Sequence, residues 1–233
     1  MVCNVITADK ANRLFWLGRY AQRVYISLHL LRRYYDKVID GDIANLKEYY
    51  DCLGVDSDGQ DEASVEFQLS QLYDIKNGCS IATSLNEAMS NGIVLRRDIT
   101  SESLSYVEMS RTLLNECSSV QESNITHLQP VTDYMLAFFG SIEERVFDDS
   151  IRNFLRLGRL IESIDLRTRF NYPYPRIEEL YIRLKEILQR TGAIVNSEAI
   201  GRLELLISES AYQSESIEYR AAMLSNLNKV VSI

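Results

Sequence analysis

Proline is scarce in this sequence, which leaves long segments free to be helical. Only three of the 233 residues are prolines, at positions 130, 173 and 175, and only ten are glycines. A proline inside a helix removes a backbone donor and clashes with the preceding turn, so its absence before position 130 permits several long helices there. The alternation of apolar and polar residues that is typical of half-buried strands is also scarce. Both features favour an all-α fold.

Cysteine and histidine are too few and too scattered to form a disulfide framework or a zinc site. No Cys-x-x-Cys pair is present, so we expect the reduced thiols of a cytoplasmic protein. His29 and His127 have no second ligand at the usual spacing. The acidic stretch 56–62 resembles a calcium loop, but its glycine comes two positions too early, so we expect an acidic surface loop and no metal site. The cysteines are Cys3, Cys52, Cys79 and Cys117.

An excess of basic charge and long apolar runs are missing as well. Lys and Arg number 25 against 33 Asp and Glu, a formal net charge of −8, whereas nucleic-acid binding depends on cations that neutralise phosphates. No segment approaches the roughly 18 consecutive apolar residues of a membrane span. The first ten residues have no basic segment followed by an apolar core, and no P-loop or Gly-x-Gly-x-x-Gly motif occurs. We therefore expect a cytoplasmic protein without a nucleic-acid partner, membrane association, secretory signal or cofactor of its own.

Apolar residues recur at three- and four-residue spacing along most of the chain, which predicts amphipathic helices. The clearest stripe runs from Leu14 to Leu31, inside a helix expected over 9–39, and another follows Pro175. We expect one domain over residues 1–233, built as a single multi-helix bundle. Its core is expected to include the C-terminal residues Ile207, Ala211, Ile217 and Leu224. Further helices are expected near 43–53, 63–75, 80–95, 102–120, 131–144, 149–171, 197–211 and 215–231.

One segment of the sequence occurs twice, at an offset of 140 residues. Leu14–Arg23 aligns with Phe154–Ser163, with an identical Leu-Gly-Arg core and matching apolar positions on both sides. A glycine in a helix interior costs on the order of 1 kcal/mol relative to alanine, so equivalent glycines in two long helices indicate a compensating role. We predict that Gly18 and Gly158 let these two helices approach closely, because no Cβ separates the backbones.

Polar and charged residues follow the glycine in each copy. Arg19, Gln22 and Arg23 lie at i, i+3 and i+4 and so share one helix face. One interpretation is a solvated face laced with ion pairs. The other is a cleft between the two helices that binds a carboxylate or a phosphate. In the second copy the charged stripe consists of Arg159, Glu162, Asp165 and Arg169.

The repeated segments resemble the signature of the alpha-E family, an all-helical bacterial domain with a Glu-Arg motif. Leu14–Arg23 is similar to the family pattern LYWLGRYxERAE, and Phe154–Asp165 with the trailing Arg169 is similar to FLRLGRxlERAD…R. Between them lies a third likeness, over residues 91–102. The resemblance covers about residues 8–170 and is weaker over 175–233.

The third likeness connects two short stretches in the middle of the chain. Asn91–Arg96, followed by Thr100–Glu102, resembles the family stretch NARxVR…SxE, although Ile93 replaces one arginine. Ser101 precedes an acidic residue in a first helical turn, so we expect Ser101 to be the N-cap of the helix that follows.

Two departures from the family pattern leave each Glu-Arg pair with one member. Gln22 stands where the first copy of the pattern has glutamate, and Ser163 stands where the second copy has arginine. We therefore expect a composite ion pair between Arg23 and Glu162.

The resemblance implies association with a ligase. Alpha-E proteins accompany circularly permuted ATP-grasp enzymes, which activate a carboxylate as an acyl phosphate and form an amide bond. The chain is thus expected to be a helical, non-catalytic partner of an amide or peptide ligase that supplies ATP and Mg²⁺, and to bind the ligase, its peptide substrate or both. Two alternatives are a stand-alone enzyme with an Arg/Glu cleft and a purely structural interaction bundle. The candidate cleft comprises Arg19, Gln22, Arg23, Arg96, Glu102, Arg159, Glu162, Asp165 and Arg169.

Overall fold

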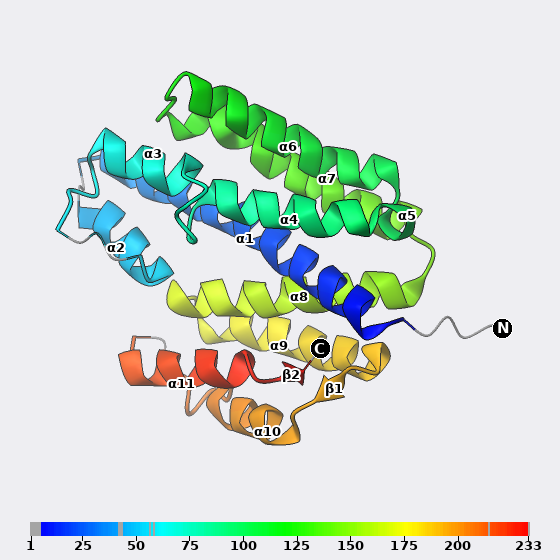
Figure 1. Ribbon diagram of the computed structural model, residues 1–233. Coiled ribbons are helices and arrows are strands. Elements are labelled where there is room, and N and C mark those ends of the chain that lie inside the picture. Colours follow the sequence, from blue (N-terminus) through cyan, green and yellow to red (C-terminus); the bar gives the residue numbers. More distant parts are fainter. Residues whose placement is uncertain (1–5, 42–43, 56, 58, 214, 233) are drawn as a thin grey trace. The chain divides into compact units, whose positions relative to one another are not determined.

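The computed structural model describes residues 6–41, 44–55, 57, 59–213 and 215–232, and these residues are mostly helical (Figure 1). The predicted all-α class is confirmed. The chain divides into two compact units: the first comprises Met1–Arg19 and Asp148–Ile233, and the second Tyr20–Phe147. Helix α1 (Ala8–Ile39) contributes residues to both. The expectation of one domain over residues 1–233 stays a prediction.

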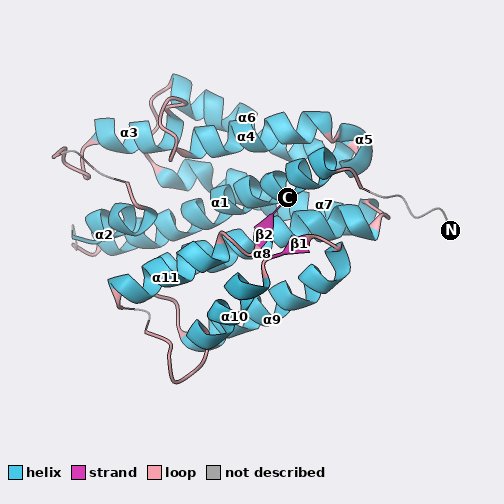
Figure 2. Ribbon diagram, turned by 60° about the horizontal axis from the view of Figure 1, so that its bottom comes forward, coloured by secondary structure: helices cyan, strands magenta, loops and turns pink. Residues whose placement is uncertain are grey.

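The first unit joins the start of α1 to the C-terminal helices. Helix α8 (Asp149–Arg169) packs against α9 (Tyr174–Thr191) and against α11 (Ile217–Leu227), and α11 packs against α10 (Ser197–Leu206). Two short strands, β1 (Ile194–Val195) and β2 (Val231–Ser232), pair antiparallel and are drawn in magenta in Figure 2. This pairing holds the last described residues of the chain beside the segment that follows α9.

Local chemistry sets the ends of α8 and α9. The side chain of Asp148 caps α8 by accepting the N–H of Ser150 at 2.8 Å. Helix α9 has Pro175 in its first turn, where the missing N–H has no helical partner to lose. It ends at Gly192, which has a φ of 61° in the left-handed region that glycine adopts without strain.

The terminal helix α11 buries a different face from the one that the sequence predicts. Of the expected core residues Ile207, Ala211, Ile217 and Leu224, only Ile207 is buried, and Ile217 is 71% exposed. The buried stripe consists instead of Tyr219, Met223 and Leu227. Residue 217 lies two positions before this stripe, and a step of two residues leads to the opposite side of a helix.

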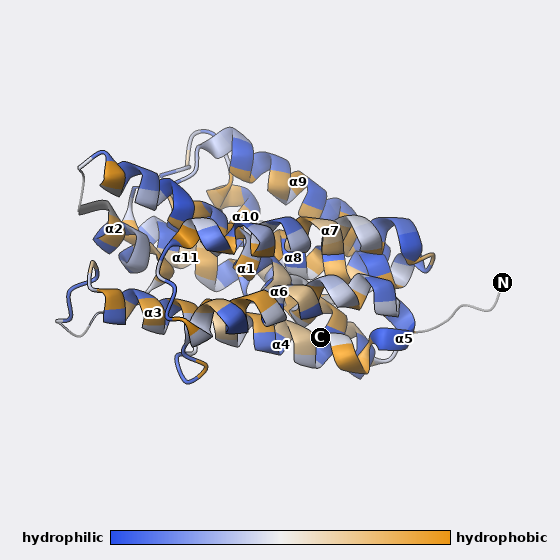
Figure 3. Ribbon diagram, turned by 90° about the horizontal axis from the view of Figure 1, so that it is seen from above, coloured by the Kyte–Doolittle hydropathy of each residue, from blue (hydrophilic) through white to orange (hydrophobic). Residues whose placement is uncertain are grey.

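The second unit contains the rest of α1 and the central helices. These are α2 (Ala44–Leu53), α3 (Val65–Tyr73), α4 (Ile81–Val94), the short α5 (Arg96–Ile99), α6 (Ser101–Ser119), the 3₁₀ turn η1 (Ile125–Leu128) and α7 (Gln129–Arg145). Helix α6 packs against α7, α4 and α3. Apolar and polar segments alternate along these helices, as Figure 3 shows, and this pattern is typical of helices that bury one face.

Aromatic and hydroxyl side chains fill the core of the second unit. Tyr49 and Tyr50 are buried, and their rings stack edge to face at 5.0 Å, while Tyr50 also meets the ring of Phe67 at 4.9 Å. The Tyr49 hydroxyl donates to the carbonyl of Ser27 at 3.1 Å. Both tyrosines therefore belong to the core.

Most helix boundaries lie within two residues of the predicted ranges, but α10 and α11 end five and four residues before the predicted ends, and the cap of α6 differs. Thr100 is the N-cap, because its Oγ1 accepts the N–H of Ser103 at 3.3 Å. Ser101, the expected cap, is already the first helical residue. The apolar stripe from Leu14 to Leu31 in α1 is buried as predicted.

Cys52, Cys79 and Cys117 are free thiols, and Cys3 lies outside the described residues, as do Asp56 and Asp58 of the acidic stretch. Within the described ranges no helix has the length and hydropathy of a membrane span.

Candidate functional site

The two repeated helices meet at their glycines. A Cβ atom on Gly18 would lie 2.2 Å from the carbonyl oxygen of Leu155, and one on Gly158 would lie 2.0 Å from the carbonyl oxygen of Phe15. Real Cβ atoms do not approach backbone atoms this closely, so only glycine fits at either position. The close helix approach expected from the repeat is present in the first unit.

This contact has an internal two-fold character. Gly18 faces the residue three positions before Gly158, and Gly158 faces the residue three positions before Gly18. The contact between a glycine of one copy and the residue three positions before the glycine of the other is therefore made twice, with the copies exchanged, as in an isologous interface between identical subunits. The same symmetry brings the backbone nitrogen of Arg19 beside Gly158 and that of Arg159 beside Gly18.

The first arginine after the glycine enters a buried ionic network. Arg19 is only 8% exposed, and its Nε donates to Oε2 of the fully buried Glu162 at 2.8 Å. Its Nη2 lies 3.9 Å from Oδ2 of buried Asp165. Asp165 in turn accepts a hydrogen bond from Nε of Arg169 at 2.6 Å. The described contacts of this network thus join two arginines to two buried carboxylates.

Aromatic rings and an amide complete the surroundings of Arg19. The carbon at the centre of its guanidinium lies 5.2 Å from the ring centroid of Trp16 and 5.9 Å from that of Phe15, within the range of cation–π attraction. Its Nη1 donates to Oδ1 of Asn228 at 3.1 Å. The head group of Arg19 is therefore held from three sides, and its orientation is set before any ligand arrives.

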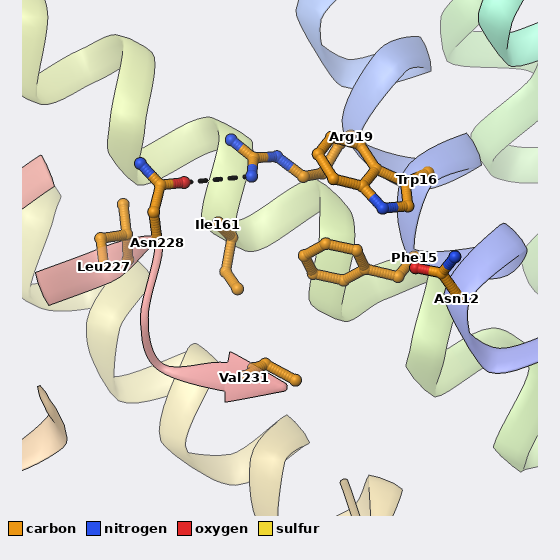
Figure 4. Close-up of a pocket in the computed structure, with 8 residues that line it drawn as sticks. All are labelled: Asn12, Phe15, Trp16, Arg19, Ile161, Leu227, Asn228 and Val231. Atoms are coloured by element: carbon orange, nitrogen blue, oxygen red, sulfur yellow. Dashed lines mark hydrogen bonds between the residues drawn. The ribbon is translucent and has the colours of Figure 1, made fainter. Parts of the chain in front are cut away.

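A pocket of about 260 Å³ opens beside this head group, as Figure 4 shows. Arg19 is the charged member of its lining, and Asn12 and Asn228 are the amides. The other lining residues are apolar: Phe15, Trp16, Ile161, Leu227 and Val231. Pockets that bind small molecules combine apolar walls with a few fixed polar groups in this way.

Arg96 and Glu102 lie in the second unit, at the junction between α5 and α6. Arg96 is exposed, and its Nε donates to Oγ of Ser101 at 3.0 Å. Glu102 is exposed in the first turn of α6, where its own backbone N–H and the hydroxyl of Thr100 lower the pKa of its carboxyl. Both residues fix the start of α6, and neither lines the pocket described above.

The remaining predicted site residues are divided between the two units. Gln22 is buried and Arg23 is half-buried in the second unit, whereas Arg159 is half-buried in the first. Glu162 was expected to pair with Arg23. Its described ion pair is with Arg19, which lies one helical turn before Arg23 in α1. The pair between Arg23 and Glu162 stays a prediction.

The basic cleft expected from the sequence stays a prediction. Arg19 and Arg169 each contact a buried carboxylate, so their positive charge is compensated inside the protein. The other polar lining residues, Asn12 and Asn228, were not predicted from the sequence. Trp16, the single tryptophan of the chain, lies within the repeated motif and was the one sequence signal that pointed to this pocket. Asn228 had none, since it lies 209 positions from the arginine that it contacts.

No group of three or more His, Cys, Asp or Glu side chains that could hold a metal ion occurs among the described residues. The glycine contact and the ionic network define a class of all-helical protein, in which two Leu-Gly-Arg helices meet at glycines beside a buried Arg–carboxylate network.

Comparison with known families identifies this class. The model of the Alpha-E family, described as a predicted alpha-helical domain with a conserved ER motif, matches residues 8–214. The chain belongs to the Alpha-E family. Searches of curated proteins and of solved structures found no significant match. Leu227, Asn228 and Val231 lie beyond the matched residues, so one wall of the pocket comes from outside the family region.

Proposed function

We propose that this chain is a helical partner subunit of an ATP-grasp-type amide or peptide ligase and that it binds the ligase together with its peptide substrate. Membership of the Alpha-E family supports the ligase association, and the pocket beside Arg19 supports a binding role. On this proposal ATP and Mg²⁺ are bound by the ligase, and both proteins act in the cytoplasm.

The observation that carries the binding role is the state of the buried carboxylates. Glu162 contacts Arg19, and Asp165 contacts Arg169. Neither carboxylate lines the pocket, where Arg19 presents the charge. An arginine keeps its proton at all ordinary pH values and cannot serve as a general base. The arrangement therefore supports recognition of a ligand more than acid–base catalysis by this chain.

The proposal is tested by coexpressing the chain with a circularly permuted ATP-grasp ligase and measuring ATP consumption with and without this subunit. We expect the two proteins to copurify and ATP consumption to depend on the chain. Arg19→Lys keeps the charge but loses the planar fork that contacts Glu162 and Asn228 together, so it should lower ATP consumption. Arg97→Lys, at an exposed arginine of α5, is the matched control and should leave it unchanged.

Each alternative has its own outcome in this experiment. Ligase activity that is independent of the chain would reject the proposal. Amide formation by the chain alone would favour the stand-alone enzyme. A folded Arg19→Lys variant with unchanged copurification and unchanged ATP consumption would favour the purely structural bundle.

A further inference from the structure

The pocket beside Arg19 contains hydrogen-bonding capacity that the protein does not use. Arg19 donates through Nε and Nη1, but its Nη2 lies 3.9 Å from Asp165, which is beyond hydrogen-bond distance. Nη2 therefore makes no hydrogen bond within the described part of the chain. The amide of Asn12, on the pocket wall that also carries Phe15, has no described hydrogen-bond partner either (Figure 4). Both groups are available to a ligand.

The charge around these groups favours an uncharged ligand. The carboxylates of Glu162 and Asp165 lie beside the guanidinium of Arg19, and Asp165 also contacts Arg169. An anion bound at Nη2 would stand close to the Asp165 carboxylate, and like charges at such separations repel strongly where little water screens them. A neutral carbonyl oxygen accepts the same hydrogen bond without that repulsion.

The remaining walls require an apolar group. Phe15, Ile161, Leu227 and Val231 surround the space below the guanidinium in Figure 4. A volume of about 260 Å³ lies just below the range of roughly 300–1,000 Å³ that is usual for drug-sized ligands, so it suits one amino-acid side chain with its flanking amide.

We propose that this pocket binds an uncharged peptide segment, with one apolar side chain between Phe15 and Val231 and the neighbouring peptide carbonyl at Arg19. Asn12 pairs with the next amide of the same segment. The inference deepens the proposed function and rests on it for the peptide as the source of the ligand. It replaces the carboxylate or phosphate that the sequence suggested as ligand.

The experiment is a titration of the purified full chain, followed through the fluorescence of Trp16. This residue is the single tryptophan and it lines the pocket, so its emission reports on this site. The probes are N-acetyl-phenylalaninamide and N-acetyl-leucinamide, which are neutral, and N-acetyl-phenylalanine and inorganic phosphate, which are anionic. We expect saturable binding of a neutral amide with a dissociation constant on the order of millimolar, as for other small fragments. The anions should bind at least about tenfold more weakly.

Variants locate the binding. Val231→Phe fills the pocket and should weaken amide binding at least about fivefold, whereas Val120→Phe, at an exposed valine of the second unit, makes the same change elsewhere. Asn12→Leu, at a half-buried position without a described partner, should weaken binding with an unchanged unfolding midpoint. If Val231→Phe does not fold, Asn12→Leu alone tests whether the amide binds in this pocket.

Several results would overturn the inference: an anion that binds as tightly as the amides, no binding of either amide, or binding that Asn12→Leu and Val231→Phe leave intact. The ligase is absent from this titration, so the two proposals can fail separately. Amide binding by a chain that the ligase ignores would reject the proposed function alone. A ligase that depends on a chain with no affinity for the amides would reject the inference alone.

Discussion

Gly18 and Gly158 make equivalent contacts across the two helices. Gly18 lies against the carbonyl of Leu155, three positions before Gly158, and Gly158 lies against the carbonyl of Phe15, three positions before Gly18. The helix contact thus requires a residue without a Cβ at both positions. The two glycines bring α1 and α8 together at the point where Arg19 enters the network with Glu162. Close packing at the glycines and burial of the ion pair are therefore expected to depend on each other.

Alanine at either glycine should destabilise the protein. Gly18→Ala and Gly158→Ala each place a Cβ within 2.2 Å of a backbone carbonyl, and a backbone cannot move aside as a flexible side chain can. We expect the free energy of unfolding to fall by about 1–3 kcal/mol or more, despite the better helix propensity of alanine. Denaturant titration followed by circular dichroism measures the change.

The controls for this prediction should change stability in the opposite direction. Gly140 in α7 and Gly201 in α10 have open space where a Cβ would lie. Alanine there should stabilise by up to about 1 kcal/mol through helix propensity alone. A Gly158→Ala variant as stable as Gly140→Ala would contradict the close approach.

The ion pair between Arg19 and Glu162 should behave as a buried pair in a double-mutant cycle. Arg19→Met removes the cation that contacts a fully buried carboxylate, and we expect a cost of about 3–5 kcal/mol. The double variant Arg19→Met with Glu162→Leu should cost clearly less than the two single changes together, because no charge is then left without its partner. Unfolding midpoints in guanidinium chloride give all four corners of the cycle.

The matched surface change is Arg97→Met, at an exposed arginine. Its effect should stay within about 0.5 kcal/mol. Additive costs for the Arg19 and Glu162 variants would show that the two side chains are not coupled.

Much of this fold could be predicted from the sequence because helices are encoded locally. A repeat of three to four residues locates the buried face of α1 without any knowledge of what packs on it. The glycine contact was also predictable, since a costly residue at two equivalent positions requires a common reason.

The features that sequence analysis overlooked depend on contacts between distant residues. Asn228 reaches Arg19 across 209 positions, and no spacing rule connects them. Ile217 belongs to an apolar pattern, but it lies on the side of α11 opposite to the buried Tyr219, Met223 and Leu227. The cap at Thr100 depends on a positive φ of 70°, which residue type alone did not indicate.

The buried tyrosines of the second unit should make stability depend on alkaline pH. Burial, with a smaller contribution from Tyr35, raises the pKa of Tyr50 above its ordinary value of 10.0, and burial raises the pKa of Tyr35 to about 12. Above pH 10 the unfolded chain loses these protons first, so the folded state binds more protons and stability falls as pH rises. Each such group contributes a slope of up to about 1.4 kcal/mol per pH unit.

Tyr50→Phe should therefore flatten this dependence. Below pH 10 the variant and the parent protein should have similar stability, because phenylalanine fills nearly the same buried space. Between pH 10 and 12 the variant should lose less stability. Urea midpoints at a series of pH values test this, with Tyr106→Phe at a half-buried position as the control. Equal slopes for Tyr50→Phe and the parent protein would exclude Tyr50 as a source of the alkaline loss.

The C-cap residue of α11, Asn228, should influence the pocket through its side-chain amide. Asn228 accepts a hydrogen bond from Nη1 of Arg19 and donates one to the carbonyl of Leu224. Asn228→Ala removes both bonds and should cost about 1 kcal/mol. It should also change the emission of Trp16, because Arg19 stacks on that ring and loses one of its supports.

Asn226 supplies the control for this prediction, because its side chain donates to the carbonyl of Ala222 in the same way but does not line the pocket. Asn226→Ala should reproduce the loss of the local helix bond and leave Trp16 emission unchanged. A shift in emission of equal size in both variants would mean that Trp16 responds to fraying of α11. A shift confined to Asn228→Ala would show that residues beyond the family-matched region set the position of the arginine in the repeated motif.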